Sequence, residues 1–156
     1  MLVATVITVV VLGGYGVHAA WNSRTGGDAG SGAPRGYEAS VERSIFLAGT
    51  VIGQGVDARL VSDLPPFLDS ANRAIFLVGT ERRALEKLAA TAPRSEAEVI
   101  ASTLASLDAL TEALIWWRDS VYNLRLAAVG DARAAVDAAT SRLRADLERW
   151  RSLTAS

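Results

Sequence analysis

The sequence contains no cysteine, and its 156 residues include a single histidine, His18, and a single lysine, Lys87. Without cysteine the chain has no disulfide framework, no zinc–thiolate site, no cysteine-held iron–sulfur cluster and no cysteine nucleophile. Because the only histidine lies near the N-terminus, the remainder lacks nucleophile–histidine pairs and the Glu-x-x-His motif of di-iron bundles. These shortages predict a protein that is not an enzyme and that holds no metal or cofactor.

The chain also has almost no net charge. The 16 basic and 17 acidic residues give a formal net charge of −1, so no overall basic field is available to hold nucleic acid. No glycine-rich loop continues into Gly-Lys-Ser/Thr, the pattern that cradles phosphate. Asp108, Glu112 and Asp119 fall on one polar side of a predicted helix, which we interpret as a solvated face and not as an acid–base site.

Residues 1–21 contain no Asp, Glu, Lys or Arg. A transmembrane helix needs about 20 predominantly apolar residues, so we predict an uncleaved single-pass anchor in the cell membrane. Tyr15 and Trp21 are the amphipathic aromatics typical of the headgroup level. A cleaved signal peptide is the alternative, since Val17-His18-Ala19 resembles a small-x-small cleavage site, but no basic residue precedes the apolar run.

Two further features concern the packing of this predicted anchor and its orientation in the membrane. Gly13, Gly14 and Gly16 would let a neighbouring membrane helix pack closely, although glycine is common in membrane helices generally. Arg24 and Arg35 are the only basic residues near the segment, and both follow it. The positive-inside rule therefore favours a cytoplasmic position for the rest of the chain.

Residues 22–36 are dominated by glycine and other small residues, which predicts a flexible linker. About fifteen residues of this composition reach ~20 Å, so the domain beyond, residues 37–156, is expected to stay close to the membrane.

From residue 37 onward apolar residues recur at helical spacing. We predict four helices, with breaks at Pro65-Pro66, Pro93 and Gly130-Asp131 and with the third helix reaching Val129. Short connections favour an antiparallel four-helix bundle, and the alternative is two hairpins that complete their core only in an oligomer or on a partner. A coiled-coil-like seam runs along the third helix through Thr103, Leu107, Leu110, Leu114, Trp117, Val121, Leu124 and Ala128.

An octet occurs twice in the domain. Arg43–Thr50 reads RSIFLAGT, and Arg73–Thr80 reads RAIFLVGT, with six of eight positions identical. We interpret Gly49 and Gly79 as a packing device that lets two helices pass closely, with a ligand-binding repeat as the alternative. The similarity ends with the octet, so it is not the period of a solenoid.

Two tryptophans are candidate partner contacts. Trp117 falls on the seam of the third helix, but Trp116 is turned by ~100° from it, onto a face of small and polar residues. A large aromatic there is typical of an interface, and filling a gap inside the bundle is the alternative. Trp150 lies in a run of arginines near the C-terminus, which suits either anionic headgroups or the negative end of a helix dipole.

The predicted anchor, linker and bundle, together with the missing chemistry, indicate a non-catalytic, membrane-anchored accessory or scaffolding subunit. Its partners would be membrane lipid and either a membrane protein complex or further copies of itself. A sensory or ligand-binding helical bundle that acts with a signalling partner is the alternative. A membrane-tethered coiled-coil spacer is a third reading.

Overall fold

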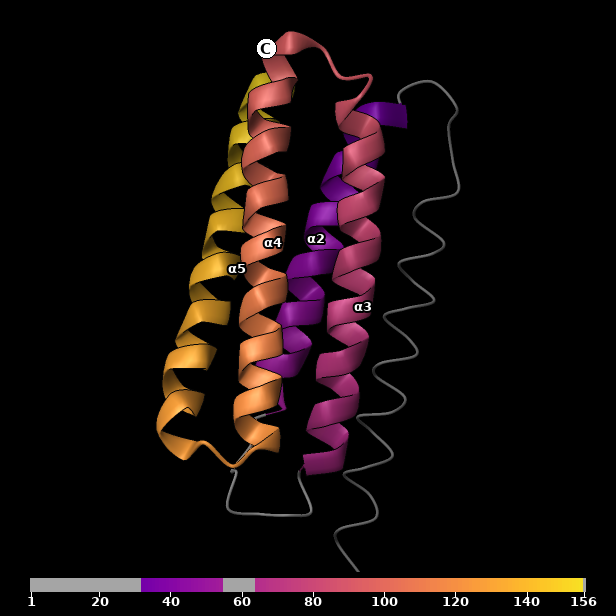
Figure 1. Ribbon diagram of the computed structural model, residues 1–156. Coiled ribbons are helices and arrows are strands. Elements are labelled where there is room, and N and C mark those ends of the chain that lie inside the picture. Colours follow the sequence, from indigo (N-terminus) through magenta and orange to yellow (C-terminus); the bar gives the residue numbers. More distant parts are fainter. Residues whose placement is uncertain (1–31, 55–63, 156) are drawn as a thin grey trace, which may run out of the picture. The chain divides into compact units, whose positions relative to one another are not determined.

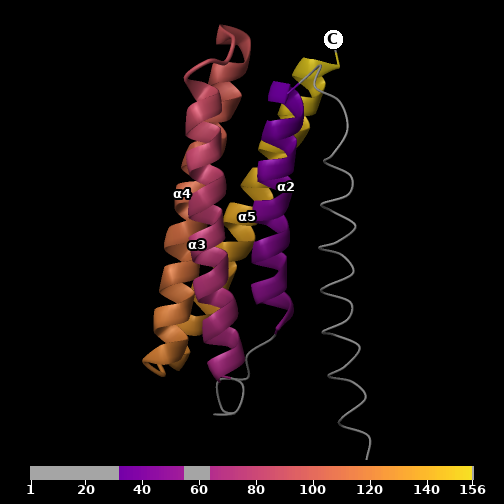
Figure 2. The same ribbon diagram turned by 90° about the vertical axis from the view of Figure 1, so that its right-hand side faces the viewer.

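The structure is a computed structural model that describes residues 32–54 and 64–155. This part of the chain contains four helices and no strand: α2 (Gly32–Gly53), α3 (Leu64–Ala89), α4 (Arg94–Tyr122) and α5 (Leu126–Thr154). Successive helices run in opposite directions, as Figures 1 and 2 show from two sides. The predicted all-α class and helical bundle are confirmed for these residues. The predicted anchor at 1–21, with Gly13, Gly14 and Gly16, lies outside them.

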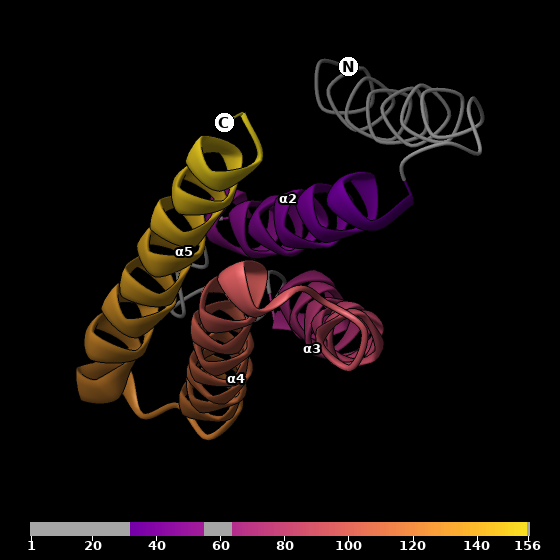
Figure 3. The ribbon, with the colours of Figure 1, turned by 90° about the horizontal axis from the view of Figure 1, so that it is seen from above.

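The four helices follow one another around a ring, which Figure 3 shows from above. A polar side-chain contact joins each neighbouring pair, including the first helix and the last. Consequently the seam between α2 and α3 and the seam between α4 and α5 lie on opposite sides of the ring. The four contacts are Arg43–Glu81, Arg82–Asp108, Ser102–Asp146 and Glu42–Arg151.

The helix boundaries differ from those predicted. α4 ends at Tyr122, so its predicted extension to Val129 was wrong. The side-chain amide of Asn123 donates to the carbonyl of Asp119 at 2.8 Å, and Leu124 takes a left-handed conformation with φ of 54°. Asn123 thus helps to satisfy the end of the helix, as Asn and Gly commonly do. The expected cap at Gly130 instead lies inside α5.

α2 and α3 also begin at earlier residues than the sequence predicts. α2 begins at Gly32, within the segment whose composition predicts a linker, and α3 begins at Leu64, before Pro65 and Pro66. Proline fits here because the first turn of a helix does not need its backbone N–H groups for internal hydrogen bonds.

One core runs through the bundle. The predicted seam of α4 is buried from Thr103 to Val121, whereas Leu124, beyond the end of the helix, is 60% exposed. On α2 the buried stripe consists of Tyr37, Val41, Ala48 and Val51, whereas Ile45 and Ile52 are only half-buried.

The glycines of the repeated octet do not mark a close approach between helices, so that interpretation was wrong. A methyl group at Gly49 or Gly79 would have no atom of another helix within 4 Å. What the two octets share is a buried small residue, Ser44 or Ala74, followed two positions later by an exposed phenylalanine.

Tyr37 connects α2 to two other helices. Its ring stacks on Trp150 of α5 with ring centroids 4.0 Å apart, and its hydroxyl lies 2.6 Å from the hydroxyl oxygen of Thr103 on α4. Burial raises the pKa of Tyr37 to about 12, against the opposing effect of the hydrogen bond to Thr103. The phenol therefore stays neutral in the folded bundle at any ordinary pH.

Asp146 ties α5 to α4. Although only 4% exposed, its carboxylate accepts hydrogen bonds from Ser102 Oγ at 2.8 Å and Ser106 Oγ at 2.9 Å, and Arg149 lies 3.8 Å away. A buried carboxylate is tolerated only when such donors replace the water that it loses. This cluster fixes the spacing of α4 and α5.

Asp146→Ala is expected to lower the free energy of unfolding by about 1–3 kcal/mol, because it leaves the buried hydroxyl of Ser106 and the half-buried hydroxyl of Ser102 without their acceptor. Asp137, which is exposed on the same helix, supplies the matched control, and Asp137→Ala should change stability by less than about 0.5 kcal/mol. Denaturant titration followed by circular dichroism measures both. Equal effects of the two substitutions would contradict a structural role for the Asp146 cluster.

Candidate docking surface

Trp116 and Trp117 are adjacent in α4 but lie in different surroundings. Trp117 is 2% exposed and packs edge-on against Phe67 of α3, with ring centroids 5.1 Å apart. Trp116 is 45% exposed. The turn of ~100° between successive helical residues accounts for the difference, because it carries Trp116 off the core-facing seam.

A hollow of about 340 Å³ lies beside Trp116, between α4 and α5. Five of its eight lining residues are alanines, whose side chains end at Cβ, and Trp116 is the one large apolar side chain among them. Glu112 of α4 and Arg142 of α5, both exposed, complete the lining. We call this hollow the Trp116 groove. Its floor consists of Ala109, Ala113, Ala135, Ala138 and Ala139.

The Trp116 groove is built on a fixed helix pair. The buried hydrogen bond between Ser106 and Asp146 lies about one turn beyond Ala109 on α4 and Arg142 on α5, next to the groove. Substitution of the floor alanines by larger residues would fill the hollow. The groove is therefore a consequence of small residues on two helices whose spacing is set by neighbouring polar contacts.

The groove offers apolar area and one charge of each sign. Within the described residues neither Glu112 nor Arg142 takes part in an ion pair. An exposed tryptophan beside small residues, with polar groups at the rim, has the composition of a protein–protein contact. No group of three or more His, Cys, Asp or Glu side chains suited to a metal occurs in the part of the chain that the structure describes.

Trp150, the second candidate contact residue, lies in the core. It is fully buried against Tyr37, so a partner has no access to it while the bundle is folded. Its indole N–H, like that of Trp117, has no hydrogen-bond partner among the described residues. The position of Trp150 on the apolar stripe of α5 accounts for its burial, and the arginines around it lie on the other faces of the helix.

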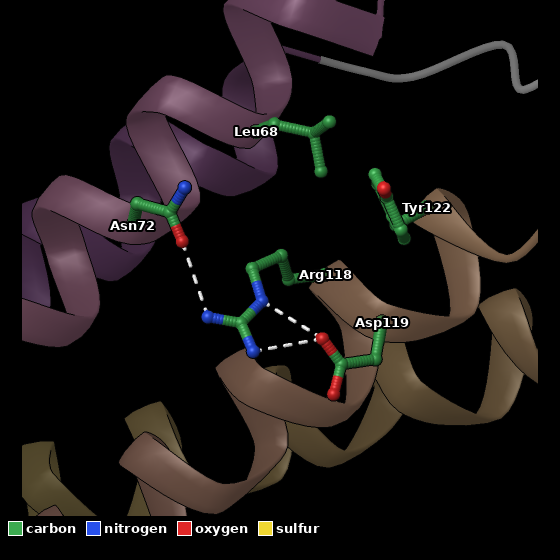
Figure 4. A pocket seen from close by; sticks show the side chains of 5 residues that line it. All are labelled: Leu68, Asn72, Arg118, Asp119 and Tyr122. Atoms are coloured by element: carbon green, nitrogen blue, oxygen red, sulfur yellow. Dashed lines mark hydrogen bonds and ion pairs between the residues drawn. The ribbon is translucent and has the colours of Figure 1, made fainter.

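A second hollow, of about 320 Å³, lies between α3 and α4 (Figure 4). Arg118 spans it, donating from Nη1 to Asn72 Oδ1 at 3.1 Å and from Nε to Asp119 Oδ1 at 2.8 Å. Leu68 and Tyr122 form its apolar side. Because Asp119 and Asn72 already engage the guanidinium, this hollow presents no uncompensated charge that would select a ligand.

Among the described residues, α4 is the one helix whose length and composition would suffice to cross a membrane, with a mean hydropathy of 1.4. The same helix supplies the seam at the centre of the bundle. A helix buried on several sides in a protein core has the same apolar composition as a membrane helix, so this property does not distinguish the two settings.

No protein-family model, curated protein or solved structure matches this chain. Its function is therefore inferred from its own residues.

The different exposure of the two tryptophans predicts that truncation of Trp117 lowers stability far more than truncation of Trp116. Trp117→Ala should lower the free energy of unfolding by about 3–5 kcal/mol, since it opens a cavity in the core. Trp116→Ala should change it by less than about 1 kcal/mol, because about half of that side chain is already in water. Denaturant titrations of the two variants measure the contrast. A loss for Trp116→Ala as large as that for Trp117→Ala would show that Trp116 serves the core and not a contact surface.

Proposed function

We propose that this protein is a non-catalytic accessory or scaffolding subunit, held at the cell membrane by residues 1–21, whose bundle docks on a membrane protein complex. The observation that carries the proposal is the Trp116 groove, in which a half-exposed tryptophan stands over an alanine floor. Buried tryptophans commonly dominate the binding energy of protein interfaces, and a shallow floor leaves room for a partner's side chains.

The rim charges supply the specificity of the proposed contact. Glu112 and Arg142 belong to different helices and have no ion-pair partner in the described residues, so a partner that brings the opposite charges would neutralise both. Charge complementarity at a rim mainly selects the partner and speeds its association, while the apolar centre provides affinity. A partner helix with small apolar residues and two flanking charges fits this arrangement.

The remaining features agree with attachment to a membrane. The charge-free run at 1–21 has the length of a membrane span, and Arg24 and Arg35 favour a cytoplasmic bundle. The competing proposal of a ligand-binding sensor requires an enclosed site for a small molecule. The hollows described here are open grooves, and the floor of the Trp116 groove lacks polar groups to orient a ligand.

The test is capture of the tagged full-length protein from native membranes in mild detergent, followed by mass spectrometry. The proposal predicts heterologous membrane proteins in stoichiometric amount with the wild type, and their loss with Trp116→Ala. Tyr122→Ala is the matched control, because Tyr122 is an exposed aromatic outside the groove and its removal should leave the capture unchanged. Recovery of the protein alone, or capture that Trp116→Ala does not affect, would contradict docking through the groove.

A further inference from the structure

The repeated octets place a phenylalanine on the outer surface of each of two neighbouring helices. Phe46 of α2 is 59% exposed and Phe76 of α3 is 68% exposed. Each lies nine residues after a fully or almost fully buried aromatic, Tyr37 or Phe67, which at 100° per residue is half a turn around the helix. Both phenylalanines therefore point away from the core.

The two phenylalanines also lie at nearly the same level. The ion pair between Arg43 and Glu81, at 3.0 Å, sets the register of the antiparallel pair α2 and α3. Phe46 follows Arg43 by three residues and Phe76 precedes Glu81 by five, both toward the same end of the bundle. At a rise of 1.5 Å per residue the two levels differ by only ~3 Å. The octets thus set two apolar side chains side by side across the outer surface of this pair.

Exposed basic residues lie along the same side of α3 as Phe76, whereas the charged residue four positions before Phe46 on α2 is Glu42, which is paired with Arg151. Arg73, Arg83 and Lys87 are exposed on the outer side of α3, and the exposed acidic residues of this helix are Asp69 and Glu86, the latter paired with Arg82. Arg73 and Lys87 form no ion pair within the described residues. Outward phenylalanines with neighbouring cations are the combination by which interfacial helices hold anionic membranes. We call Phe46, Phe76, Arg73, Arg83 and Lys87 the α2–α3 face.

A membrane anchor at residues 1–21, as proposed above, would keep the bundle close to a bilayer. The chain joins the bundle at Gly32, the first residue of α2, so the helix that carries Phe46 is the one attached to the proposed anchor. Only the ten residues 22–31 then separate the proposed anchor from α2, and ten residues of glycine-rich composition reach ~17 Å.

We propose that the bundle rests on the bilayer through the α2–α3 face, with Phe46 and Phe76 in the headgroup region and the three cations against anionic headgroups. This inference rests on the proposed membrane anchor, and it adds an orientation: lipid on one side of the bundle and the docking groove on the other. Because the attraction of these cations to anionic headgroups is screened by ions, the contact is reversible and weakens as salt is added.

The test uses the full-length protein reconstituted in vesicles of equal parts phosphatidylcholine and phosphatidylglycerol. Because the chain has no cysteine, one environment-sensitive fluorophore can be attached at Thr80→Cys, one turn from Phe76, or at Ala138→Cys, in the Trp116 groove on the other side of the ring. Lipids with a quencher in the headgroup should quench the label at 80 more strongly than the label at 138, because only the former lies on the lipid-facing side. In vesicles of phosphatidylcholine alone, or at high salt, that difference should shrink.

Two variants separate the face from the groove. Phe46→Ser combined with Phe76→Ser should abolish the difference in quenching, and its unchanged melting curve would show that the bundle is intact, since both side chains are exposed. Trp116→Ala should keep the quenching difference while it loses the captured partner. Failure of the groove proposal and failure of the lipid proposal are thereby read out independently.

Four results would overturn the inference. They are equal quenching at the two labels, stronger quenching at 138, quenching that the double serine variant leaves unchanged, and protection of the label at 80 in native membranes but not in lipid vesicles. The last result would assign the α2–α3 face to a protein. A chain that does not remain with the vesicles would overturn the anchor, and with it this inference, whereas partner capture in detergent would still report on the groove.

Discussion

The ring of four helices is closed by Tyr37, whose ring stacks on Trp150 of α5 while its hydroxyl meets Thr103 of α4. Tyr37 lies near the start of α2, so this contact decides whether α2 covers the core of its own chain. Glu42 and Arg151 reinforce the same closure at the surface, 2.7 Å apart. If α2 were released, α3, α4 and α5 would expose one side of their apolar core. The Trp116 groove and the α2–α3 face would then no longer lie on opposite sides of one bundle.

The Trp116 groove and the α2–α3 face differ in shape because the outward-facing residues of the two helix pairs differ in size. Alanines of α4 and α5 leave the hollow beside Trp116, and the Asp146 cluster keeps that helix pair at a fixed spacing. The octets of α2 and α3 instead project Phe46 and Phe76 beyond the surface. A hollow suits a protein partner that inserts side chains into it, whereas projecting phenylalanines suit a lipid bilayer, whose headgroup region they can enter. The proposed division between a protein side and a lipid side follows from this contrast in shape.

Regular spacing made the core of α4 predictable, because large apolar residues at steps of three and four select one side of a helix, and the same rule separated Trp116 from Trp117. The end of α4 was not predictable, since Leu124 adopts a backbone conformation that leucine itself does not favour. Asp146 reads locally as a surface charge, and its burial depends on serines some forty residues away on another helix. The groove likewise needs the register of α4 against α5, which apolar spacing within each helix leaves open.

The most direct test of this account is whether one chain closes its own ring. In a chain without other cysteines, Glu42→Cys and Arg151→Cys place a thiol on the first and last helices of the bundle, at the site of their ion pair. Treatment with a short thiol-reactive crosslinker should yield a crosslinked monomer with faster gel mobility, because both thiols belong to one bundle. Covalent dimers without crosslinked monomer would contradict the account, since α2 would then complete the core of another copy.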